Sequence, residues 1–281
     1  MHNPFNYYKR NERDMDRQLQ NMENESIFII REAYAKVKDL ALLWSMGKDS
    51  TVLLHLVKKA FMGNCPMPLV HVDESYEPEE MIAWRDDYVK RHGLQLIVGQ
   101  NKQALSEGMG PQLGRLTCCN ALKTVALQQT VKEHNIQGLL VGIRRDEEGS
   151  RGKERVVSPR SSDGAWQYKN QPAEIWNHFN LHTPKNIHLR IHPLLHWDEL
   201  SIWEYIASES IEIIPLYFAR NGQRYRSLGC APCTGSFPSS ATTVAEIIEE
   251  LKTSSESERA GRAHDKEEAY ALQKLRSQGF M

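Results

Sequence analysis

The sequence lacks any long apolar run, and no stretch approaches the roughly 20 residues that a membrane-spanning helix needs. Its polar amino terminus also lacks the apolar core of a signal peptide. Neither sign of charge is in excess, because 35 Lys and Arg residues face 36 Asp and Glu residues, which gives a formal net charge of -1. These absences predict a cytoplasmic protein with no membrane anchor and with no global attraction to nucleic acid.

Internal repeats are also absent, and cysteine is sparse, with five residues in 281. A chain of this length can bury one substantial core and carry a small second subdomain or tail. In an intracellular chain, cysteines are more often reduced, metal-bound or catalytic than paired in a disulfide framework.

Residues 40–60 have the pattern of a buried strand, a tight polar turn and an amphipathic helix. Residues 40–44 are apolar without alternation, as in a parallel strand covered on both faces, and apolar residues then recur at helical spacing from Val52 to Ala60. The turn between them reads Ser-Met-Gly-Lys-Asp-Ser over residues 45–50. Such a turn, at the carboxyl end of a parallel strand, directs backbone N–H groups and the positive end of the helix dipole at one point, which suits a phosphate.

Four residues of this turn are predicted to hold phosphate: Ser45, Gly47, Lys48 and Ser50. Gly47 lets the backbone come close, Lys48 adds a point charge, and the serine hydroxyls donate to phosphate oxygens. Asp49 is expected to orient the loop or a metal. The turn differs from the Gly-x-x-x-x-Gly-Lys-Ser/Thr loop of P-loop NTPases. It resembles the Ser-x-Gly-Lys-Asp-Ser signature of the PP-loop ATP pyrophosphatases, which implies cleavage of ATP between its α and β phosphates; the alternative is an ordinary strand-turn-helix.

Strands and helices alternate along the rest of the chain. Further strands are predicted at 68–73, 93–99, 138–142 and from 191, and helices from 26, at 79–91, 120–134 and 199–208, and from 244 to 251. This order predicts an α/β fold, a doubly wound parallel sheet with helices on both faces. Residues 1–25 are expected to form a flexible arm, 26–218 the ATP-binding domain with a long loop at 156–190, and 219–281 a cysteine-containing, irregular and helical carboxyl-terminal extension and tail.

Polar residues follow two further predicted strands. Ligands of doubly wound sheets sit beyond the carboxyl ends of strands, so Asp73 is expected to face the nucleotide and to hold Mg²⁺ or a water on it; a helix cap or a solvated turn acid is the alternative. Arg144, Arg145 and Asp146 follow the strand at 138–142. Arginine there can clamp phosphates and stabilise charge as the α–β bond breaks, whereas the alternative is a solvated charged loop.

Four cysteines form two close pairs that lie far apart in the sequence, Cys118 with Cys119 and Cys230 with Cys233. Two such pairs can converge on one metal, and thiolates bind both zinc and [4Fe-4S] clusters. Adjacent cysteines fit an ordinary zinc knuckle poorly. The arrangement resembles the iron-sulfur motif of assimilatory adenylylsulfate reductases, down to Gly-Cys-Ala-Pro-Cys-Thr at 229–234, and this implies a [4Fe-4S] cluster. Zinc and unligated or redox-active thiols are the alternatives.

Over most of its length the chain resembles the small, ATP-binding subunit of bacterial sulfate adenylyltransferases. The matching stretches are 26–33, the 45–50 loop, 71–73, 144–147, 153–155, 193–197, 214–218 and 257–262. The resemblance implies an adenine nucleotide α-hydrolase-like fold and synthesis of adenylyl sulfate and pyrophosphate with the help of a larger GTPase subunit.

Two departures separate the chain from better-known members of that family. Those members lack the cysteine pairs, and many carry a longer charged insertion where this chain runs briefly from Phe218 to Arg226. The cysteine pairs instead resemble those of ATP pyrophosphatases that activate an oxygen for replacement by sulfur, including those of DNA phosphorothioation systems, which work with a cysteine desulfurase. Adenylylsulfate reductases need a nucleophilic cysteine in a carboxyl-terminal tail, and this chain has no cysteine after Cys233.

We therefore interpret the chain as a PP-loop enzyme that binds ATP with Mg²⁺, releases pyrophosphate and transfers AMP to an oxyanion. The residues expected at the reacting end are Lys48, Asp49, Arg144, Arg145 and Asp146. The favoured acceptor is DNA activated for sulfur insertion with a cysteine desulfurase as partner, and sulfate with a GTPase subunit is the alternative. A non-catalytic ATP-binding scaffold is a third reading, and assembly into a homo-oligomer stays open.

Overall fold

The computed structural model describes residues 12–161, 164–166, 168–169, 171, 173–176, 178–182, 187–254, 256–259, 277 and 279. Residues 1–11 of the predicted arm and 260–276 of the predicted tail lie outside these. The α-helices are α1 (Glu12–Lys36), α2 (Lys48–Ala60), α3 (Glu79–Arg91), α4 (Lys102–Ser106), α5 (Arg115–Cys119), α6 (Ala126–Glu133), α7 (Glu199–Ser208) and α8 (Val244–Thr253), and the π-helix η2 (Asn120–Val125) joins α5 to α6. The 3-10 turns are η1 (Pro111–Leu113), η3 (Arg151–Lys153), η4 (Pro215–Tyr217) and η5 (Ala231–Cys233).

The strands form one large sheet and one small hairpin. They are β1 (Leu40–Leu43), β2 (Leu69–Val72), β3 (Leu96–Gly99), β4 (Gly138–Val141), β5 (Val157–Arg160), β6 (His188–Ile191), β7 (Gln223–Arg224) and β8 (Phe237–Pro238). The large sheet has the order β3-β2-β1-β4-β6-β5, and β7 pairs with β8. Neighbours among β3, β2, β1, β4 and β6 run parallel, whereas β5 runs antiparallel to β6. The predicted parallel α/β sheet is confirmed.

The strand order reverses next to β1. The chain moves outward from β1 to β2 and β3, and then returns to β4 on the other side of β1. In open α/β sheets such a reversal opens a crevice beyond the carboxyl ends of the two strands that flank it. This places the turn after β1 and the segment after β4 at the natural ligand site of the fold.

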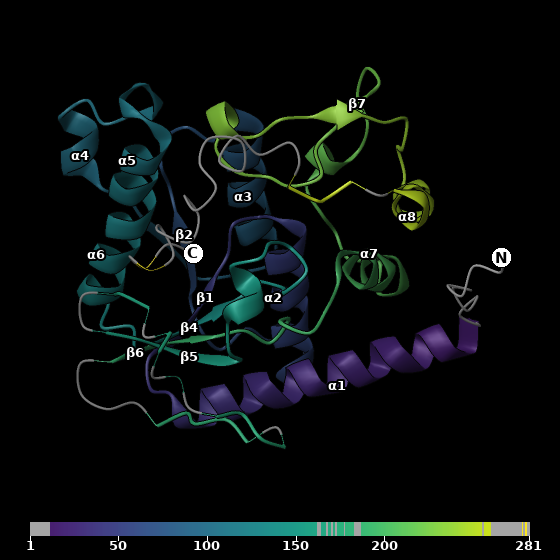
Figure 1. The fold of residues 1–281 in the computed structure, drawn as a ribbon, viewed down its shortest axis with the longest axis horizontal. Coiled ribbons are helices and arrows are strands. Elements are labelled where there is room, and N and C mark those ends of the chain that lie inside the picture. The colour runs from purple at the N-terminus through teal and green to yellow at the C-terminus, as the bar shows by residue number, and fades with distance from the viewer. Residues whose placement is uncertain are drawn as a thin grey trace, which may run out of the picture.

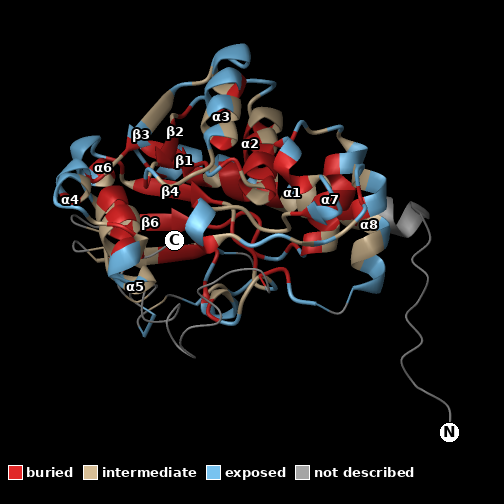
Figure 2. Ribbon diagram, turned by 90° about the horizontal axis from the view of Figure 1, so that it is seen from above, coloured by how far each residue is buried: buried red, intermediate tan, exposed pale blue. Residues whose placement is uncertain are grey.

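Helices cover the sheet on two sides. Helix α2 packs against both α1 and α7, and α8 packs against α7. In Figure 1, α1 runs along one whole side of the molecule, and α4, α5 and α6 gather at the opposite end from α7 and α8. Figure 2 shows the buried strands between the group of α2 and α7 and the group of α4, α5 and α6. All four residues of β1 are buried, which explains why its sequence is apolar without alternation.

The helix predicted to begin at Ser26 begins at Glu12, so the expected arm is helical over residues 12–25. Tertiary contacts hold these earlier turns. Leu19 is buried in the core, and Glu23 accepts hydrogen bonds from Lys59 Nζ at 2.7 Å and from Tyr205 Oη at 2.6 Å. The apolar pattern of the sequence did not reveal that α1 starts at Glu12, because polar contacts such as those of Glu23 hold the first turns in place of some apolar ones.

Two strands lie inside the segment predicted to be a long loop at 156–190. Strand β5 was missed because it contains Pro159, which argues against a central strand but is tolerated at an edge, where β5 lies. Strand β6 ends at Ile191, where the sequence had suggested that a strand begins. The helix predicted from 120 starts five residues earlier as α5, so Cys118 and Cys119 lie within a helix rather than before it.

The carboxyl-terminal extension packs on the body of the protein. Ile247 of α8 and Ala241 belong to the same core cluster as β1 and α2. The predicted division of the chain after residue 218 stays a prediction. Among the described helices there is none with the length and apolarity to cross a bilayer.

We expect stability to fall between pH 7 and pH 5 because of His192, which follows β6. Its side chain is buried, and burial lowers its pKa to about 4. The unfolded chain then binds a proton below about pH 6.5 that the folded chain does not, so His192 removes about 2 kcal/mol of stability by pH 5. Denaturant unfolding followed by circular dichroism at both pH values measures this.

The matched variant is His192→Asn. In the wild type the Arg155 carbonyl oxygen lies 2.7 Å from His192 Nδ1, and the asparagine amide can donate a hydrogen bond to the same oxygen. It should show a weaker pH dependence, whereas His134→Asn at an exposed position should behave as the wild type does. An unchanged pH dependence in His192→Asn would contradict the assignment.

Candidate active site

The turn after β1 closes on itself through its two serines. Ser45 N–H donates to Ser50 Oγ at 3.3 Å, the two hydroxyl oxygens lie 3.3 Å apart, and Ser50 Oγ–H donates to the Gly47 carbonyl at 3.0 Å. The first intrahelical bond of α2 runs from Thr51 N–H to the Gly47 carbonyl. The amides of Asp49 and Ser50 therefore precede the helical hydrogen-bond ladder, as an anion site at a helix start requires.

The strained residue of this turn is Met46 rather than Gly47. Met46 has φ +58°, in the left-handed region that non-glycine residues seldom adopt, and its side chain is fully buried, whereas Gly47 has an ordinary φ of -64°. A Cβ at Gly47 would lie 3.5 Å from Tyr217 Oη. That is an ordinary van der Waals distance, so the contacts and backbone conformation of the turn do not themselves require a glycine at 47.

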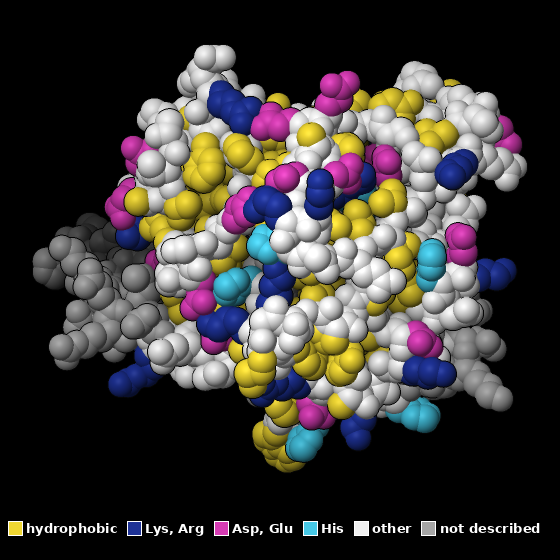
Figure 3. Space-filling view, turned by 180° about the vertical axis from the view of Figure 1, so that it is seen from behind, with side chains coloured by type: hydrophobic (Ala, Val, Ile, Leu, Met, Phe, Trp, Pro, Cys, Tyr) yellow, Lys and Arg dark blue, Asp and Glu magenta, His cyan; other side chains and the backbone are white. Residues whose placement is uncertain are grey.

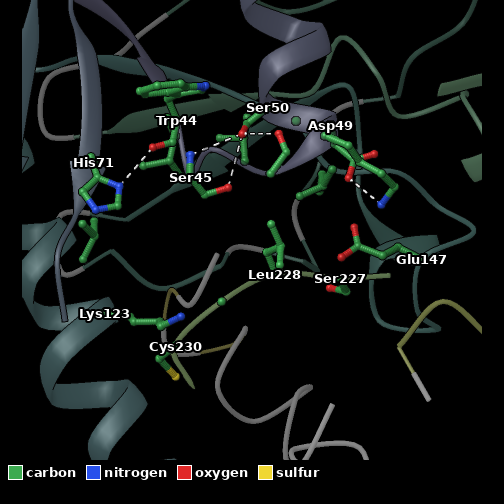
Figure 4. A pocket seen from close by; sticks show the side chains of 18 of the residues that line it. Trp44, Ser45, Asp49, Ser50, His71, Lys123, Glu147, Ser227, Leu228 and Cys230 are labelled. Carbon is green, nitrogen blue, oxygen red and sulfur yellow. Dashed lines mark hydrogen bonds and ion pairs between the residues drawn. The ribbon is translucent and has the colours of Figure 1, made fainter. Parts of the chain in front are cut away.

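One cavity lies against this turn at the carboxyl ends of β1, β2 and β4. Its lining includes all four predicted phosphate-binding residues of the turn, Ser45, Gly47, Lys48 and Ser50, and also Asp49. Figure 4 shows Ser45, Ser50 and Asp49 on one side of it and Cys230 and Lys123 on the other. Gly142, just after β4, also lines the cavity, and a Cβ there would lie 3.1 Å from the backbone of Asp49. A glycine at 142 thus lets β4 approach the start of α2.

Lys48 is almost completely buried, with 1% of its side chain exposed. Its Nζ donates to Asp49 Oδ2 at 3.1 Å and also to Glu258, while its backbone N–H donates to Tyr217 Oη at 2.9 Å. Arg144 is buried as well and binds Asp49 and Glu258, and its Nε donates to Asp146 Oδ1 at 3.0 Å. Two cations and three carboxylates therefore form one connected network at the turn, and Lys48, Asp49 and Glu258 of this network line the cavity.

The segment after β4 was expected to line the reacting end through Arg144, Arg145 and Asp146. None of the three belongs to the lining of the cavity, which takes Ile143 and Glu147 from this segment instead. Arg144 holds Asp49 from behind the turn. The Nη1 atom of Arg145 lies 2.7 Å from His196 Nδ1, away from the cavity lining. Asp146 Oδ2 accepts a hydrogen bond of 2.9 Å from the backbone N–H of Glu199, at the start of α7. Their predicted catalytic roles stay predictions, and their positions fit support of the turn.

Asp73 likewise lies outside the lining of this cavity. Its Oδ1 accepts the amide of Ser75 at 2.7 Å, so it closes a tight turn after β2. Two neighbouring carboxylates reach the cavity in its place. Glu74 pairs with Lys123 Nζ at 2.7 Å, and Glu77 Oε2 lies 2.9 Å from His71 Nε2.

Sequence reasoning missed several residues that line the cavity: His71, Glu74, Glu77, Lys123, Glu147, Arg151, Tyr217, Glu258 and Arg259. A signal for five of them existed, because they lie in the stretches at 71–73, 144–147, 214–218 and 257–262 that match the small-subunit family: His71, Glu147, Tyr217, Glu258 and Arg259. For Tyr217, Glu258 and Arg259, the distance from the turn in sequence hid their position. Lys123 gave no such signal.

The four paired cysteines do converge, as predicted. All four line one small cavity together with Lys123 and Glu74, and Cys230 also lines the cavity of the turn. Burial raises the pKa of Cys118, and burial raises that of Cys119 to about 12. A hydrogen bond from the Cys230 thiol lowers the pKa of Cys233 to about 7, and the same bond raises that of Cys230. Cys65 stands apart, with its thiol donating to the Met67 carbonyl at 3.3 Å.

Among the described residues, no group of three or more His, Cys, Asp or Glu side chains is arranged to hold a metal ion. For Mg²⁺ this is compatible with the chemistry, because Mg²⁺ in nucleotide sites takes one or two carboxylates and completes its octahedron with phosphates and water. Asp49, Glu74 and Glu77 supply such carboxylates at the cavity. For an iron-sulfur cluster the chemistry of the donors fits, because the four cysteines line one small cavity and thiolates are the usual ligands of such clusters.

Fold and turn together define a nucleotide-binding protein of the adenine nucleotide α-hydrolase class. Solved structures share the fold. A phosphoadenylyl-sulfate reductase from Candida auris matches with a TM-score of 0.53 at 15% identity over 80% of this chain and 97% of that one. An FMN adenylyltransferase from Candida glabrata matches with a TM-score of 0.57 at 18% identity, over 95% of this chain and 85% of that one.

The chain belongs to the phosphoadenosine phosphosulfate reductase domain family, whose model matches residues 39–236. Among curated proteins it is similar to sulfate adenylyltransferase subunit 2 of Aeromonas salmonicida, with 41% identity over 93% of this chain and 95% of the relative. Sulfate adenylyltransferase subunit 2 of a Methylobacterium species is 42% identical over 93% of this chain and 94% of the relative. The resemblance read from the sequence is thus confirmed.

Proposed function

We propose that the chain is the nucleotide-binding subunit of a sulfate adenylyltransferase, an enzyme that cleaves ATP between its α and β phosphates. The observation that carries the proposal is the 45–50 turn at the reversal of the strand order, with all its polar residues and a buried Lys48 on one cavity. A sulfate oxygen attacks the α-phosphorus, the bond from that phosphorus to the α–β bridging oxygen breaks, and pyrophosphate leaves with the electron pair.

The chain's own residues act by position and charge in this reaction. The turn holds the β and γ phosphates through the amides at the start of α2, the hydroxyls of Ser45 and Ser50, and the Lys48 ammonium. Negative charge grows on the bridging oxygen as it leaves, and preorganised donors near that oxygen stabilise the transition state more than the ground state. Mg²⁺, held by carboxylates such as Asp49 or Glu74, would neutralise phosphate charge.

Sulfate is the acceptor that the relatives favour. The sequence had favoured DNA with a cysteine desulfurase, but the similar curated proteins are sulfate adenylyltransferase subunits, and no comparison supports either DNA or a desulfurase. On the face that Figure 3 draws, acidic and basic side chains are interspersed. A GTPase subunit is the proposed partner, in line with the word subunit in the names of the relatives.

The four converging cysteines are proposed to hold a [4Fe-4S] cluster, with zinc as the alternative. Cys118 and Cys119 come from α5, whereas Cys230 directly precedes the turn η5 and Cys233 is its last residue. When bound, such a group would tie these two elements together beside the nucleotide cavity. The reaction proposed above needs no electron transfer, so the role assigned to the cluster is structural.

Lys48→Ala should lower pyrophosphate release by roughly 100- to 1,000-fold, because it removes one preorganised charge from the leaving group. Pyrophosphate release with ATP, sulfate and the partner subunit measures the effect, and circular dichroism checks the fold. The matched control is Lys252→Ala on the surface of α8, where Nζ donates to Glu249 Oε1 at 2.6 Å. Full activity in Lys48→Ala would refute the assignment.

Sulfate should strongly stimulate exchange of labelled pyrophosphate into ATP, because reversal of adenylyl transfer requires the adenylyl sulfate product. The assay uses the chain with its GTPase subunit, with and without sulfate. Exchange that proceeds equally without sulfate, or that depends on DNA instead, would overturn sulfate as the acceptor.

Anaerobically purified protein should be brown and contain about four irons per chain, the content of one cubane cluster. Cys233→Ser should lose the iron and the visible absorption, whereas Cys65→Ser should keep both. A protein with one zinc per chain and no iron would support the zinc alternative. A protein that contains neither iron nor zinc would show that the thiols are unligated.

A further inference from the structure

Glu258 reaches the phosphate-binding turn from 210 positions further along the chain. Its two carboxylate oxygens have separate partners. Oε1 accepts from Lys48 Nζ, and Oε2 accepts from Arg144 Nη2. Only 5% of the side chain is exposed, and it lines the same cavity as the turn. Burial by itself would raise the pKa of Glu258, but the charges of Arg144 and Lys48 outweigh burial and hold that pKa well below its usual range.

The segment around Glu258 is fastened to three other parts of the protein. Arg226 Nη1 donates to the Glu256 carbonyl at 2.9 Å, and Arg226 Nη2 donates to Glu199 Oε2 at 2.7 Å, which ties the segment to the first turn of α7. Arg259 Nη1 donates to Glu147 Oε1 at 3.2 Å, beyond β4. Residues 256–259 are thus held over the cavity from both sides.

The need to neutralise the charge of Arg144 does not by itself explain why the Glu258 carboxylate is buried at the turn. Arg144 already pairs with Asp49 and with Asp146. The contact that Glu258 adds is the one to Lys48, whose ammonium is a compact charge on a flexible stem of four carbons. With Asp49 on one side and Glu258 on another, this ammonium is confined near the turn.

We propose that Glu258 is a positioning residue of the adenylyl-transfer site, which aims the Lys48 ammonium at the leaving pyrophosphate. This inference rests on the proposed function. Residues 256–259 are then part of the active site, and Glu258 acts through Lys48 rather than on the substrate. Because small displacements of a catalytic group lower the rate of the chemical step, the role affects kcat more than it affects ATP binding.

The first test compares Glu258→Gln and Glu258→Asp with the wild type in the full chain with its partner subunit. Glu258→Asp keeps the charge beside Arg144 but shortens the reach to Lys48. Both variants should lower kcat by about 10- to 100-fold, since a displacement of about 1 Å has an effect of that size. The KM for ATP should change by less than about threefold. The control is Glu256→Gln, an exposed side chain in the same segment, which should retain wild-type kinetics.

Thermal unfolding separates positioning from a merely structural role. Glu258→Asp should melt close to the wild type and still lose kcat. If each variant loses activity only in proportion to its folded fraction, or if both keep wild-type kcat, the proposal is overturned.

A double-mutant cycle tests whether Glu258 works through Lys48. Adding Glu258→Gln to Lys48→Ala should lower kcat by less than about twofold further, because the group that Glu258 positions is already gone. Losses that multiply would overturn the proposal. A wild-type protein that releases no pyrophosphate would instead refute the proposed function itself and the role of Glu258 with it, whereas an active wild type insensitive to Glu258 refutes this inference alone.

Discussion

The structure around the nucleotide cavity depends on burying Lys48 and Arg144 together with carboxylates. Removing one partner of a buried ion pair typically costs about 3–5 kcal/mol, because the remaining charge is left without compensation in a medium of low dielectric. Here each of the two cations has at least two carboxylate partners: Asp49 and Glu258 contact both cations, and Asp146 contacts Arg144. The network therefore links the start of α2, the segment after β4 and the carboxyl-terminal segment, three parts of the chain that share no local sequence.

This network holds the turn through Lys48 and Asp49 and leaves the two serines of the turn on the cavity. Arg144 lies behind the turn and binds Asp49, while the serine hydroxyls and the amides at the start of α2 remain on the cavity. The topology places them there, because the turn follows β1, the strand beside which the order of the sheet reverses. The same site lies next to the four thiols, with Cys230 in the lining of both cavities.

The parts of the fold that follow local rules could be predicted. The helices at 79–91 and 199–208 match their predicted bounds, and the buried strands β1, β2 and β4 lie within about one residue of theirs, because apolar runs and helical periodicity are local signals. The turn at 45–50 and the meeting of the cysteine pairs were also predicted. In contrast, Pro159 concealed an edge strand, and the polar contacts of Glu23 concealed the first half of α1.

The site itself was less predictable than the fold. A residue such as Glu258 carries no local pattern, and its role depends on an ion pair across 210 positions. Arg144 was predicted to clamp phosphate from its place after a strand. In the structure it pairs with three carboxylates, Asp49, Asp146 and Glu258, and its catalytic role stays a prediction. Sequence spacing thus located the turn that lines the cavity, while the tertiary structure decided which charged side chains face that cavity and which ones support the turn.

The central claim is that the turn around Lys48 holds the departing diphosphate of ATP. Turnover of ATP labelled in its γ phosphate tests this most directly, when the chain acts with its partner subunit and sulfate and without any added pyrophosphatase. The account predicts that the label appears in pyrophosphate, with an equal amount of adenylyl sulfate or AMP. Label in orthophosphate with ADP as the other product would contradict it.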